Sequence, residues 1–405
     1  MKMAEQSNGS ALWFSPEESE KIIYLDNGAT TYQKPSQVYD ALDTANRFLS
    51  VNAGRGSYAL AKTASEGIRL LRQNLIRLIQ APAQVEVTFT PSATCALNQI
   101  IGGITLTEKD VVYVSPFEHN AVMRTLYHKQ QICKFSIEQL PFSVDKMEID
   151  LDKCEYLFRQ KPPAFVFITH VSNVTGYILP VEKILALAKV CTGGKARVVV
   201  DGSQALGLLL VDYRKLPFDA YVFAGHKTLY APFGIAGFYK VREFNLEPYL
   251  LGGTGSDSLN LHMPQGNLEP GSYNIPAIAG LYAAVEFIKD TGVDALYRHE
   301  KHMTELMIHG LQGILGVQLY LPKDLSAHIG IVSFSLEGYL AEEVGMLLDE
   351  DYHIAVRTGY HCAPLIHEYL DDIHKGGTVR ASVSYFTTEW EIEGLIEAVR
   401  EIAEG

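Results

Sequence analysis

One lysine, Lys227, stands where its side chain could do covalent chemistry. It follows Gly225-His226 and the apolar run 220–223. A lysine just past a buried strand is poorly solvated, which lowers its pKa and frees its amine to form a Schiff base. Taken alone, the motif also fits an ordinary surface lysine. It indicates a candidate anchor for an aldehyde cofactor.

A carboxylate at the end of another predicted strand complements this lysine. The strand-like segment 197–201 ends in Asp201, and Gln204 follows three residues on. Open α/β sheets bind ligands at the carboxyl ends of their strands. Pyridoxal phosphate needs a lysine for its aldehyde and an acid near its ring nitrogen, which keeps the ring protonated as an electron sink. Lys227 and Asp201 together therefore predict a pyridoxal-phosphate site.

Three further polar residues, His119, Asn173 and Thr94, each come after a predicted strand. The His119 ring could stack on a cofactor and move protons, and a hydrogen-bonded loop histidine is the alternative. Asn173 offers an amide to a cofactor oxygen or to a substrate carboxylate. Thr94 lies where a turn enters a helix, so its hydroxyl and nearby N–H groups suit a phosphate, although a plain helix cap fits equally well.

Cys362 is a candidate sulfur nucleophile. It lies in the segment 357–364, which follows a strand-like stretch and has no helical pattern. A glycine-bearing loop beside Arg357 and His361 is expected to lower the pKa of the thiol and leave it exposed, as a nucleophile requires. A metal site made of His361, Cys362 and His367 matches no zinc spacing, so we expect no metal.

Arg380 is isolated among small and apolar residues in the segment 378–382. An arginine in such a setting either holds a carboxylate in bidentate fashion or belongs to a buried structural ion pair. The sequence leaves both roles open.

Composition limits the class of protein. The chain has 405 residues, a net charge of −13 and no block of Lys and Arg, so nucleic acid and anionic membranes are excluded as expected partners. Five cysteines at irregular spacing favour a reducing compartment over a disulfide framework. The first twenty residues contain no secretory apolar region, and no apolar stretch approaches the roughly 18 residues of a membrane span. We therefore expect a cytoplasmic protein.

Strands and helices alternate along the part of the chain that would position these residues. Strand-like segments occur at 85–89, 111–115, 164–169, 197–201 and 220–224, with helix-like segments such as 62–80 and 181–190 between them. This alternation predicts an α/β fold with a mostly parallel sheet covered by helices on both faces. The stretch 252–276 has little periodicity and is expected to border the active site.

The rest of the chain predicts a second, smaller domain of α+β type. A helix at 276–290 precedes it, and a capping box of Thr388 with Glu391 begins its last helix. Three regions follow from this pattern: an N-terminal arm at 1–30 that joins the small domain, a large cofactor-binding domain at 31–290, and a small domain at 291–405 that carries the Cys362 loop. A short helix from Ser15 is expected to start the arm.

Together these motifs resemble the class V aminotransferase-like, fold-type I pyridoxal-phosphate enzymes, and among them the cysteine desulfurase and selenocysteine lyase group. The resemblance covers roughly residues 22–400 and rests on the segments 24–30, 55–56, 118–119, 170–176, 200–204, 225–227, 269–272 and 357–362.

The resemblance implies a role for each candidate residue. Lys227 would be the Schiff-base lysine and proton shuttle, with Asp201 on the pyridine nitrogen, Gln204 on the phenolic oxygen and His119 stacked on the ring. Thr94 and His226 would hold the phosphate, and Ser272 would reach it from the partner subunit of a homodimer. Asn173 and Arg380 would fix the substrate carboxylate, with Arg357 also at the substrate.

The Arg-Thr-Gly-x-His-Cys loop resembles the desulfurase branch with a short catalytic loop, which hands sulfur to a small acceptor protein. This resemblance implies that the Cys362 thiolate takes the sulfur of L-cysteine as a persulfide and that L-alanine is released. Two alternatives stay open. One is a C–S lyase, selenocysteine lyase or epimerase-like enzyme acting on a small amino acid. The other is a non-catalytic scaffold, against which the intact Lys227 and Asp201 argue.

The chain departs from the family pattern at four places. Ala224 stands where a serine usually precedes the lysine motif, and the phosphate turn reads Ser-Ala-Thr-Cys at 92–95. Asn120 follows Glu118-His119 where a second histidine is common, and the segment 363–367 is unlike the best-known members. These departures fit a divergent subfamily.

Overall fold

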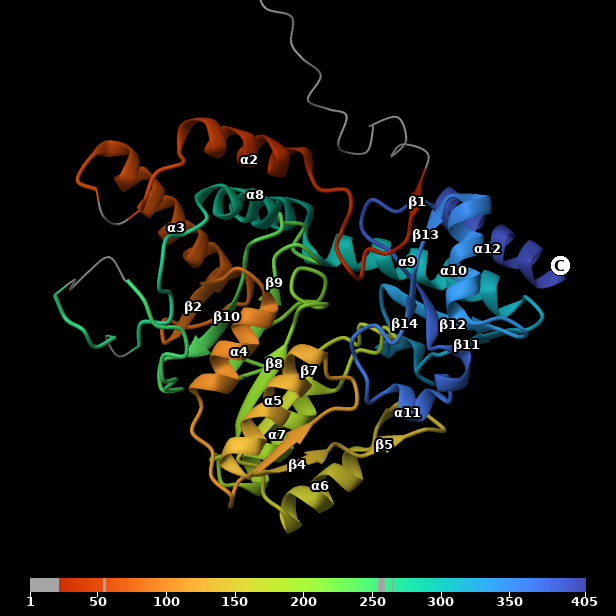
Figure 1. Ribbon diagram of the computed structural model, residues 1–405, viewed down its shortest axis with the longest axis horizontal. Coiled ribbons are helices and arrows are strands. Elements are labelled where there is room, and N and C mark those ends of the chain that lie inside the picture. Colours follow the sequence, from red (N-terminus) through yellow and green to blue (C-terminus); the bar gives the residue numbers. More distant parts are fainter. Residues whose placement is uncertain (1–21, 54–55, 254–258, 264–265) are drawn as a thin grey trace, which may run out of the picture.

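A mixed sheet forms the centre of the larger part of the molecule (Figure 1). The computed structural model describes residues 22–405 except 54–55, 254–258 and 264–265. Among these residues the sheet has the order β2 (Val85–Thr90), β10 (Ala236–Val241), β9 (Ala220–Ala224), β8 (Arg197–Asp201), β7 (Phe165–Thr169), β3 (Val111–Val114) and β4 (Ser136–Gln139). Only β10 runs antiparallel to its neighbours within this described sheet. The predicted mostly parallel sheet is confirmed.

Helices flank this sheet and complete its core. The helix α4 (Ala93–Gly103) packs on β2, β9 and β10, and α7 (Val181–Cys191) packs on β7 and β8. The helices α2 (Ser36–Phe48) and α3 (Ala59–Leu78) pack on α8 (Ile275–Thr291), beside which α2 runs in Figure 1. Further helices, α5 (Asn120–Cys133) and α6 (Leu151–Gln160), pack on α4 and α7 respectively. Their buried apolar residues form one hydrophobic core with the strands, which keeps the strand ends fixed.

A second hydrophobic core lies in the C-terminal part. It surrounds an antiparallel sheet of β11 (Val317–Leu319), β12 (Ile331–Leu336), β15 (Thr378–Ser382) and β14 (Arg357–Gly359). The helices α9 (Val293–Gln312), α10 (Ala341–Tyr352) and α12 (Glu389–Glu404) cover it. The predicted capping box begins α12, since the Thr388 hydroxyl accepts a hydrogen bond from the Glu391 N–H and the Glu391 carboxylate accepts one from the Thr388 N–H.

The N-terminal part of the described chain returns to this second core. The strand β1 (Ile23–Tyr24) pairs in parallel with β13 (Ile354–Ala355), and Leu25 is buried there. We propose on this basis the division into an arm at 1–30, a large domain at 31–290 and a small domain at 291–405. The helix expected from Ser15 lies outside the described residues.

Short elements complete the fold. The strands β5 (Phe142–Ser143) and β6 (Glu148–Ile149) form a hairpin, and α11 (His367–Leu370) follows the Cys362 loop. In the part of the chain that the structure describes, no helix combines the length and apolar character that a membrane crossing requires.

Candidate active site

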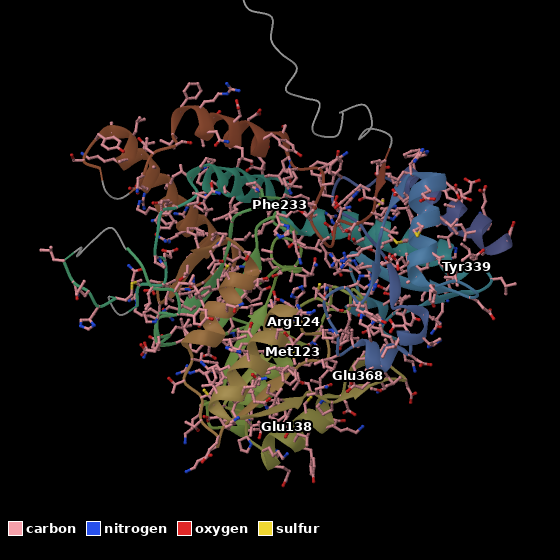
Figure 2. All side chains as sticks on the ribbon, in the orientation of Figure 1. Met123, Arg124, Glu138, Phe233, Tyr339 and Glu368 are labelled. Atoms are coloured by element: carbon pink, nitrogen blue, oxygen red, sulfur yellow. The ribbon has the colours of Figure 1, made fainter. Side chains whose placement is uncertain are left out.

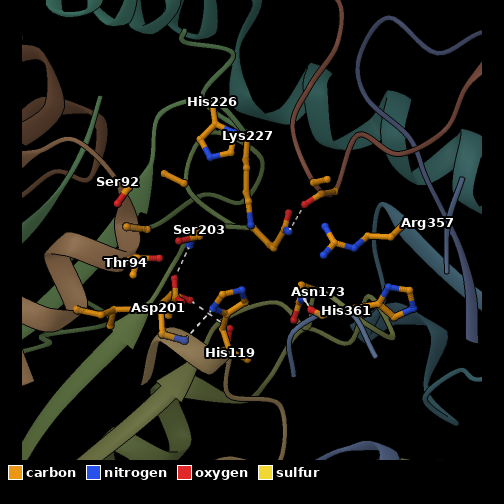
Figure 3. Close-up of a pocket in the computed structure, with 18 of the residues that line it drawn as sticks. Ser92, Thr94, His119, Asn173, Asp201, Ser203, His226, Lys227, Arg357 and His361 are labelled. Carbon is orange, nitrogen blue, oxygen red and sulfur yellow. Dashed lines mark hydrogen bonds between the residues drawn. The ribbon is translucent and has the colours of Figure 1, made fainter. Parts of the chain in front are cut away.

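A cavity of about 230 Å³ opens at the carboxyl ends of the central strands (Figure 3). The predicted site residues that line it are Thr94, His119, Asn173, Asp201, Gln204, His226, Lys227, Arg357 and Arg380. They come from both hydrophobic units, because Arg357 and Arg380 lie on β14 and β15. The two units therefore share one cavity, at the edge where open α/β sheets bind ligands.

Lys227 lies in the turn after β9, half-buried at the cavity wall. Gly225 allows this turn, because a Cβ there would lie 2.4 Å from the Ile235 carbonyl oxygen. Burial is the main cause that lowers the pKa of Lys227 to about 8; within that shift the charge of Asp201 acts against it and the charges of Arg380 and Arg357 add to it. A neutral amine is therefore accessible near physiological pH.

Asp201 and Gln204 line the same cavity as Lys227. Asp201 ends β8, is 7% exposed and accepts a hydrogen bond of 3.0 Å from the Ser203 N–H. The Gln204 amide donates to the Gly28 carbonyl oxygen at 2.7 Å. This bond connects the end of β8 to the N-terminal segment, a contact that the sequence did not predict.

His119 is the N-cap residue of α5, and its tautomer follows from that position. Its Nδ1 accepts a hydrogen bond of 3.0 Å from the Ala121 N–H, so the neutral ring carries its proton on Nε2. Burial, followed by the charge of Lys227, lowers the pKa of His119 to about 4. The ring is consequently neutral at physiological pH and presents an N–H donor.

The neighbouring Glu118 connects two strand ends below His119. Its Oε1 accepts hydrogen bonds from the Ser115 hydroxyl at 2.6 Å and from the Thr169 N–H at 2.7 Å. Burial raises the pKa of this carboxyl to about 8. Glu118 thus holds the ends of β3 and β7 in register and fixes where His119 lies.

The predicted phosphate turn begins α4. Ser92 caps the helix by accepting a hydrogen bond of 3.2 Å from the Cys95 N–H, and Thr94 in the first turn lines the cavity. The ring of another cavity residue, His226, stacks on the ring of Phe233 with 4.5 Å between their centroids. Phe233 is labelled beside α8 in Figure 2. The helix N-terminus supplies N–H groups suited to an anion.

Four buried polar atoms on residues that line the cavity have no hydrogen-bond partner among the described residues. They are Ser203 Oγ, His226 Nδ1, His361 Nδ1 and Arg380 Nε. Buried polar groups are nearly always paired, so these atoms indicate a polar ligand. Sequence reasoning assigned no role to Ser203, although its position two residues after Asp201 was a usable signal.

Arg380 forms the buried ion pair that the sequence left open as one of two roles. Its side chain is 1% exposed and donates to Asp26 Oδ1 at 2.5 Å and to the Asn173 carbonyl oxygen at 2.9 Å. Its Nε has no partner within the described structure. The Asn173 amide donates to the His361 carbonyl oxygen at 2.6 Å, so it holds the Cys362 loop in this structure.

Cys362 lies next to the cavity on a tightly held turn. Arg357 Nη2 is 3.7 Å from Cys362 Sγ, and the Asn120 N–H donates to the Cys362 carbonyl oxygen at 2.7 Å. The thiol is partly exposed, as predicted. The sequence also placed the His361 ring beside the thiol, and this expectation is wrong. The His361 Nε2 is 2.8 Å from Thr378 Oγ1, and the ring is buried against the strand of Thr378.

Ser272 lies outside the cavity within one chain. It lines a second cavity of about 290 Å³, and its hydroxyl accepts a hydrogen bond of 3.2 Å from the Asn52 amide. Within the stretch 252–276, residues 268–274 line this second cavity and none of the described residues lines the first, so the expectation that the stretch borders the first is not met within one chain.

The described residues contain no cluster of three or more His, Cys, Asp or Glu side chains arranged to hold a metal ion. His367 instead contacts Asp372, with Nδ1 2.7 Å from Oδ2. The described residues at this cavity offer an amine, a carboxylate, imidazoles and two guanidinium groups, and a thiol lies beside it.

Comparison with known proteins shows one consistent likeness. The family model of class-V aminotransferases matches residues 23–395. The chain is 32% identical over 397 residues to a probable cysteine desulfurase of Halalkalibacterium halodurans, covering 95% of this chain and 93% of that protein. It is 31% identical over 396 residues to a cysteine desulfurase of Escherichia coli O9:H4, covering 94% and 93%.

Solved structures show the same likeness. The apo structure of a cysteine desulfurase from Thermococcus onnurineus superposes with a TM-score of 0.86 at 29% identity, covering 100% of both chains. The Escherichia coli cysteine desulfurase CsdA, in an S-sulfonic acid form, gives a TM-score of 0.83 at 25% identity and covers 96% of both chains. The likeness spans both hydrophobic units.

Proposed function

Because the chain belongs to the class-V aminotransferase family and, within it, to the pyridoxal-phosphate-dependent cysteine desulfurases, we propose that it takes sulfur from L-cysteine and carries it on Cys362. The observation that supports this most directly is the Cys362 turn. Asn120 and Asn173 of the large unit both hold it at the cavity, and Arg357 lies beside the thiol.

The residues of the cavity fit pyridoxal phosphate. Its aldehyde requires an amine, its ring nitrogen an acid, and its phosphate several hydrogen-bond donors. Lys227 would bind the aldehyde, Asp201 the ring nitrogen, Gln204 the phenolic oxygen and His119 the ring face. The unpaired Ser203 Oγ and His226 Nδ1, with Thr94 and the N-terminus of α4, would hold the phosphate. When bound, the cofactor withdraws electrons from the substrate and weakens the bonds at its reacting carbons.

The chain's own groups would perform the remaining steps. The Lys227 amine can accept and return a proton because its pKa is near neutrality. The Cys362 thiolate attacks the substrate sulfur, and an S–S bond forms as the C–S bond breaks. The electron pair of that bond stays on carbon, which takes up a proton and becomes the methyl group of L-alanine. The extra sulfur remains on Cys362 as a persulfide.

A product assay tests the proposal. Supplied with L-cysteine and a thiol reductant, the loaded protein should release L-alanine and sulfide in equal amounts. Without reductant, mass spectrometry should find one added sulfur atom on the peptide that contains Cys362. Pyruvate as the main product would reject the desulfurase and favour a lyase.

Arg380→Lys should raise the KM for L-cysteine at least about tenfold and change kcat much less. Its unpaired Nε points to a further hydrogen-bond partner, which we propose is the substrate carboxylate. Lysine keeps the charge but loses the planar fork that grips a carboxylate, a loss of roughly 1.5 to 3 kcal/mol. Steady-state kinetics measures the effect, with Arg242→Lys, at the exposed Arg242–Glu86 pair, as the control. An unchanged KM would restrict Arg380 to its ion pair with Asp26.

The capture of pyridoxal phosphate by cofactor-free protein should quicken with pH and level off above about pH 8. Only the neutral amine attacks an aldehyde, and burial lowers the pKa of Lys227 from 10.5 to about 8. The neutral fraction therefore rises steeply below that pH and is nearly complete above it. Stopped-flow absorbance measures the rate. A rate that still climbs tenfold for each pH unit well above pH 8 would show an ordinary lysine.

We propose a homodimer in which Ser272 of one subunit completes the phosphate site of the other. Within one chain Ser272 lies at the second cavity, and Leu259 and Leu261 nearby in sequence are 98% and 97% exposed. Large exposed apolar side chains of this kind mark protein contacts when they cluster. Light scattering of the loaded protein tests the proposal, and a monomer would reject it.

We also propose a cytoplasmic protein that passes its sulfur to a small acceptor protein. All five cysteines are free, which supports a reducing compartment. Cys362 is partly exposed, so an acceptor thiol can reach a persulfide on it. Recovery of the protein in a fraction outside the cytoplasm would reject the location, and failure of any protein thiol to speed persulfide release would reject the acceptor.

A further inference from the structure

His367, five residues after Cys362, is buried and has no role in the proposed function so far. It is 2% exposed and begins α11. Each of its ring nitrogens faces an oxygen: Nδ1 is 2.7 Å from Asp372 Oδ2, and Nε2 is 3.1 Å from the Tyr360 carbonyl oxygen. It lies in the segment 363–367, where the chain departs from the best-known family members.

The two contacts determine where the protons of His367 lie. A carbonyl oxygen only accepts hydrogen bonds, so Nε2 must carry a hydrogen and donate it to Tyr360. Nδ1 and the Asp372 carboxyl then share one further proton. Asp372 thereby sets the orientation of the ring, as an acidic partner commonly does for a functional histidine.

Asp372 is itself firmly placed. It is fully buried, and its carbonyl oxygen accepts hydrogen bonds of 2.9 Å from the N–H groups of Lys375 and Gly377. Gly377 directly precedes β15, which pairs with β14 at the other end of the loop. The bonds from Asp372 through His367 to Tyr360 therefore cross the loop from its C-terminal end to its N-terminal end.

The Tyr360 carbonyl closes the turn that carries Cys362. It also accepts a hydrogen bond of 3.0 Å from the Ala363 N–H. The two central residues, His361 and Cys362, have φ angles of 46° and 59°, both in the left-handed region. Residues other than glycine, asparagine and aspartate adopt this conformation only when their surroundings hold it. His367 supplies the second donor to the closing carbonyl.

We propose that His367, oriented by Asp372, is a positioning residue for sulfur transfer. It holds the turn 360–363 so that Cys362 Sγ stays beside Arg357 at the cavity wall. Sulfur attack needs the two sulfur atoms aligned, and a misplacement of about 1 Å costs on the order of 100-fold in rate. This role rests on the proposed desulfurase activity, and the test below separates the two.

The first test replaces His367 with leucine, which fills similar space without hydrogen bonds. We expect kcat for alanine formation to fall about 10- to 100-fold while the KM for L-cysteine changes less than about twofold, because the substrate site keeps its residues. Amide hydrogen exchange in 360–363 should quicken about tenfold or more in cofactor-free protein. The same loop contains a matched control, the exposed His374, which should tolerate leucine.

The second test uses Asp372. Asp372→Asn keeps a hydrogen bond, because its amide can donate to Nδ1 while Nε2 still donates to Tyr360. This variant should retain kcat within about threefold, whereas Asp372→Leu should match His367→Leu. The exposed Asp371→Asn is the control, since the Asp371 side chain is 99% exposed and asparagine tolerates the φ angle of 52° at this position.

Each result decides the positioning role. A kcat within twofold of wild type for His367→Leu, or equal losses for Asp372→Asn and Asp372→Leu, overturns it. If His367→Leu does not fold, the comparison of Asp372→Asn with Asp372→Leu gives the same decision. Hydrogen exchange can be measured without turnover. If the wild type makes no alanine but His367→Leu quickens exchange in 360–363, the desulfurase is rejected and the structural link is kept. If His367→Leu leaves this exchange unchanged, the link itself is rejected.

Discussion

Cys362→Ala should abolish alanine formation from L-cysteine while the protein still binds its cofactor. Removal of a covalent nucleophile lowers turnover by about 10³-fold or more, because no other group can accept the sulfur. We expect no other cysteine to replace it, because Cys362 is the cysteine beside the cavity, where Arg357 contacts its sulfur atom. The turn should persist, because its bonds to Asn120 and Asn173 use main-chain oxygens.

The measurement is alanine release together with the absorbance spectrum of the bound cofactor. Cys133→Ala is a matched control, since Cys133 is also a free, partly exposed cysteine but ends α5 on its far side from the cavity residue His119. It should behave like wild type. Alanine release that is indifferent to Cys362→Ala would mean that sulfur leaves without a protein carrier, and the lyase alternative would gain.

Lys227→Ala should remove both the covalent attachment of pyridoxal phosphate and turnover, by about 10³-fold or more. Lys227 is the lysine whose amine lines the cavity, and burial already lowers its pKa to about 8. No other lysine among the described residues lines the cavity, so without Lys227 none of them could bind the aldehyde or return a proton to the substrate. The stability of the fold should change little, because none of its described side-chain contacts is an ion pair.

Borohydride reduction followed by peptide mass spectrometry shows which lysine carries the cofactor. Lys34→Ala is a demanding control, because burial also lowers the pKa of Lys34 to about 8, yet its Nζ donates to the Thr31 carbonyl oxygen at 2.8 Å. A depressed pKa alone would give both variants the same defect. Cofactor trapped on Lys34, or full activity in Lys227→Ala, would overturn the assignment.

The elements that carry the site could be predicted from local patterns. The strands that end at Thr169, Asp201 and Ala224 agree with β7, β8 and β9, and the cap at Thr388 is confirmed. Hydrophobic periodicity and helix capping depend on residues only a few positions apart, so both can be recognised in a single sequence. The placement of several polar residues at one sheet edge then follows from parallel topology alone.

The side-chain partners could not be predicted in this way. Arg380 contacts Asp26 of the N-terminal segment, and Gln204 contacts Gly28. These partners lie 354 and 176 positions apart, and no local spacing relates them. The same holds for His361, which the sequence placed beside the thiol but whose ring turns to Thr378 across the antiparallel strands.

Sequence by itself therefore determined the chemistry that this chain carries: a lysine amine, an acid for the cofactor ring and a loop thiol, each at the end of a recognisable element. Tertiary structure alone decided how those groups are held. It placed Asn173 under the Cys362 loop, left Ser203 Oγ and His226 Nδ1 unpaired at the cavity, and linked Asp372 through His367 to Tyr360. The reason is that residue type sets which bonds a group can make, whereas only the packing of distant segments brings a partner within reach.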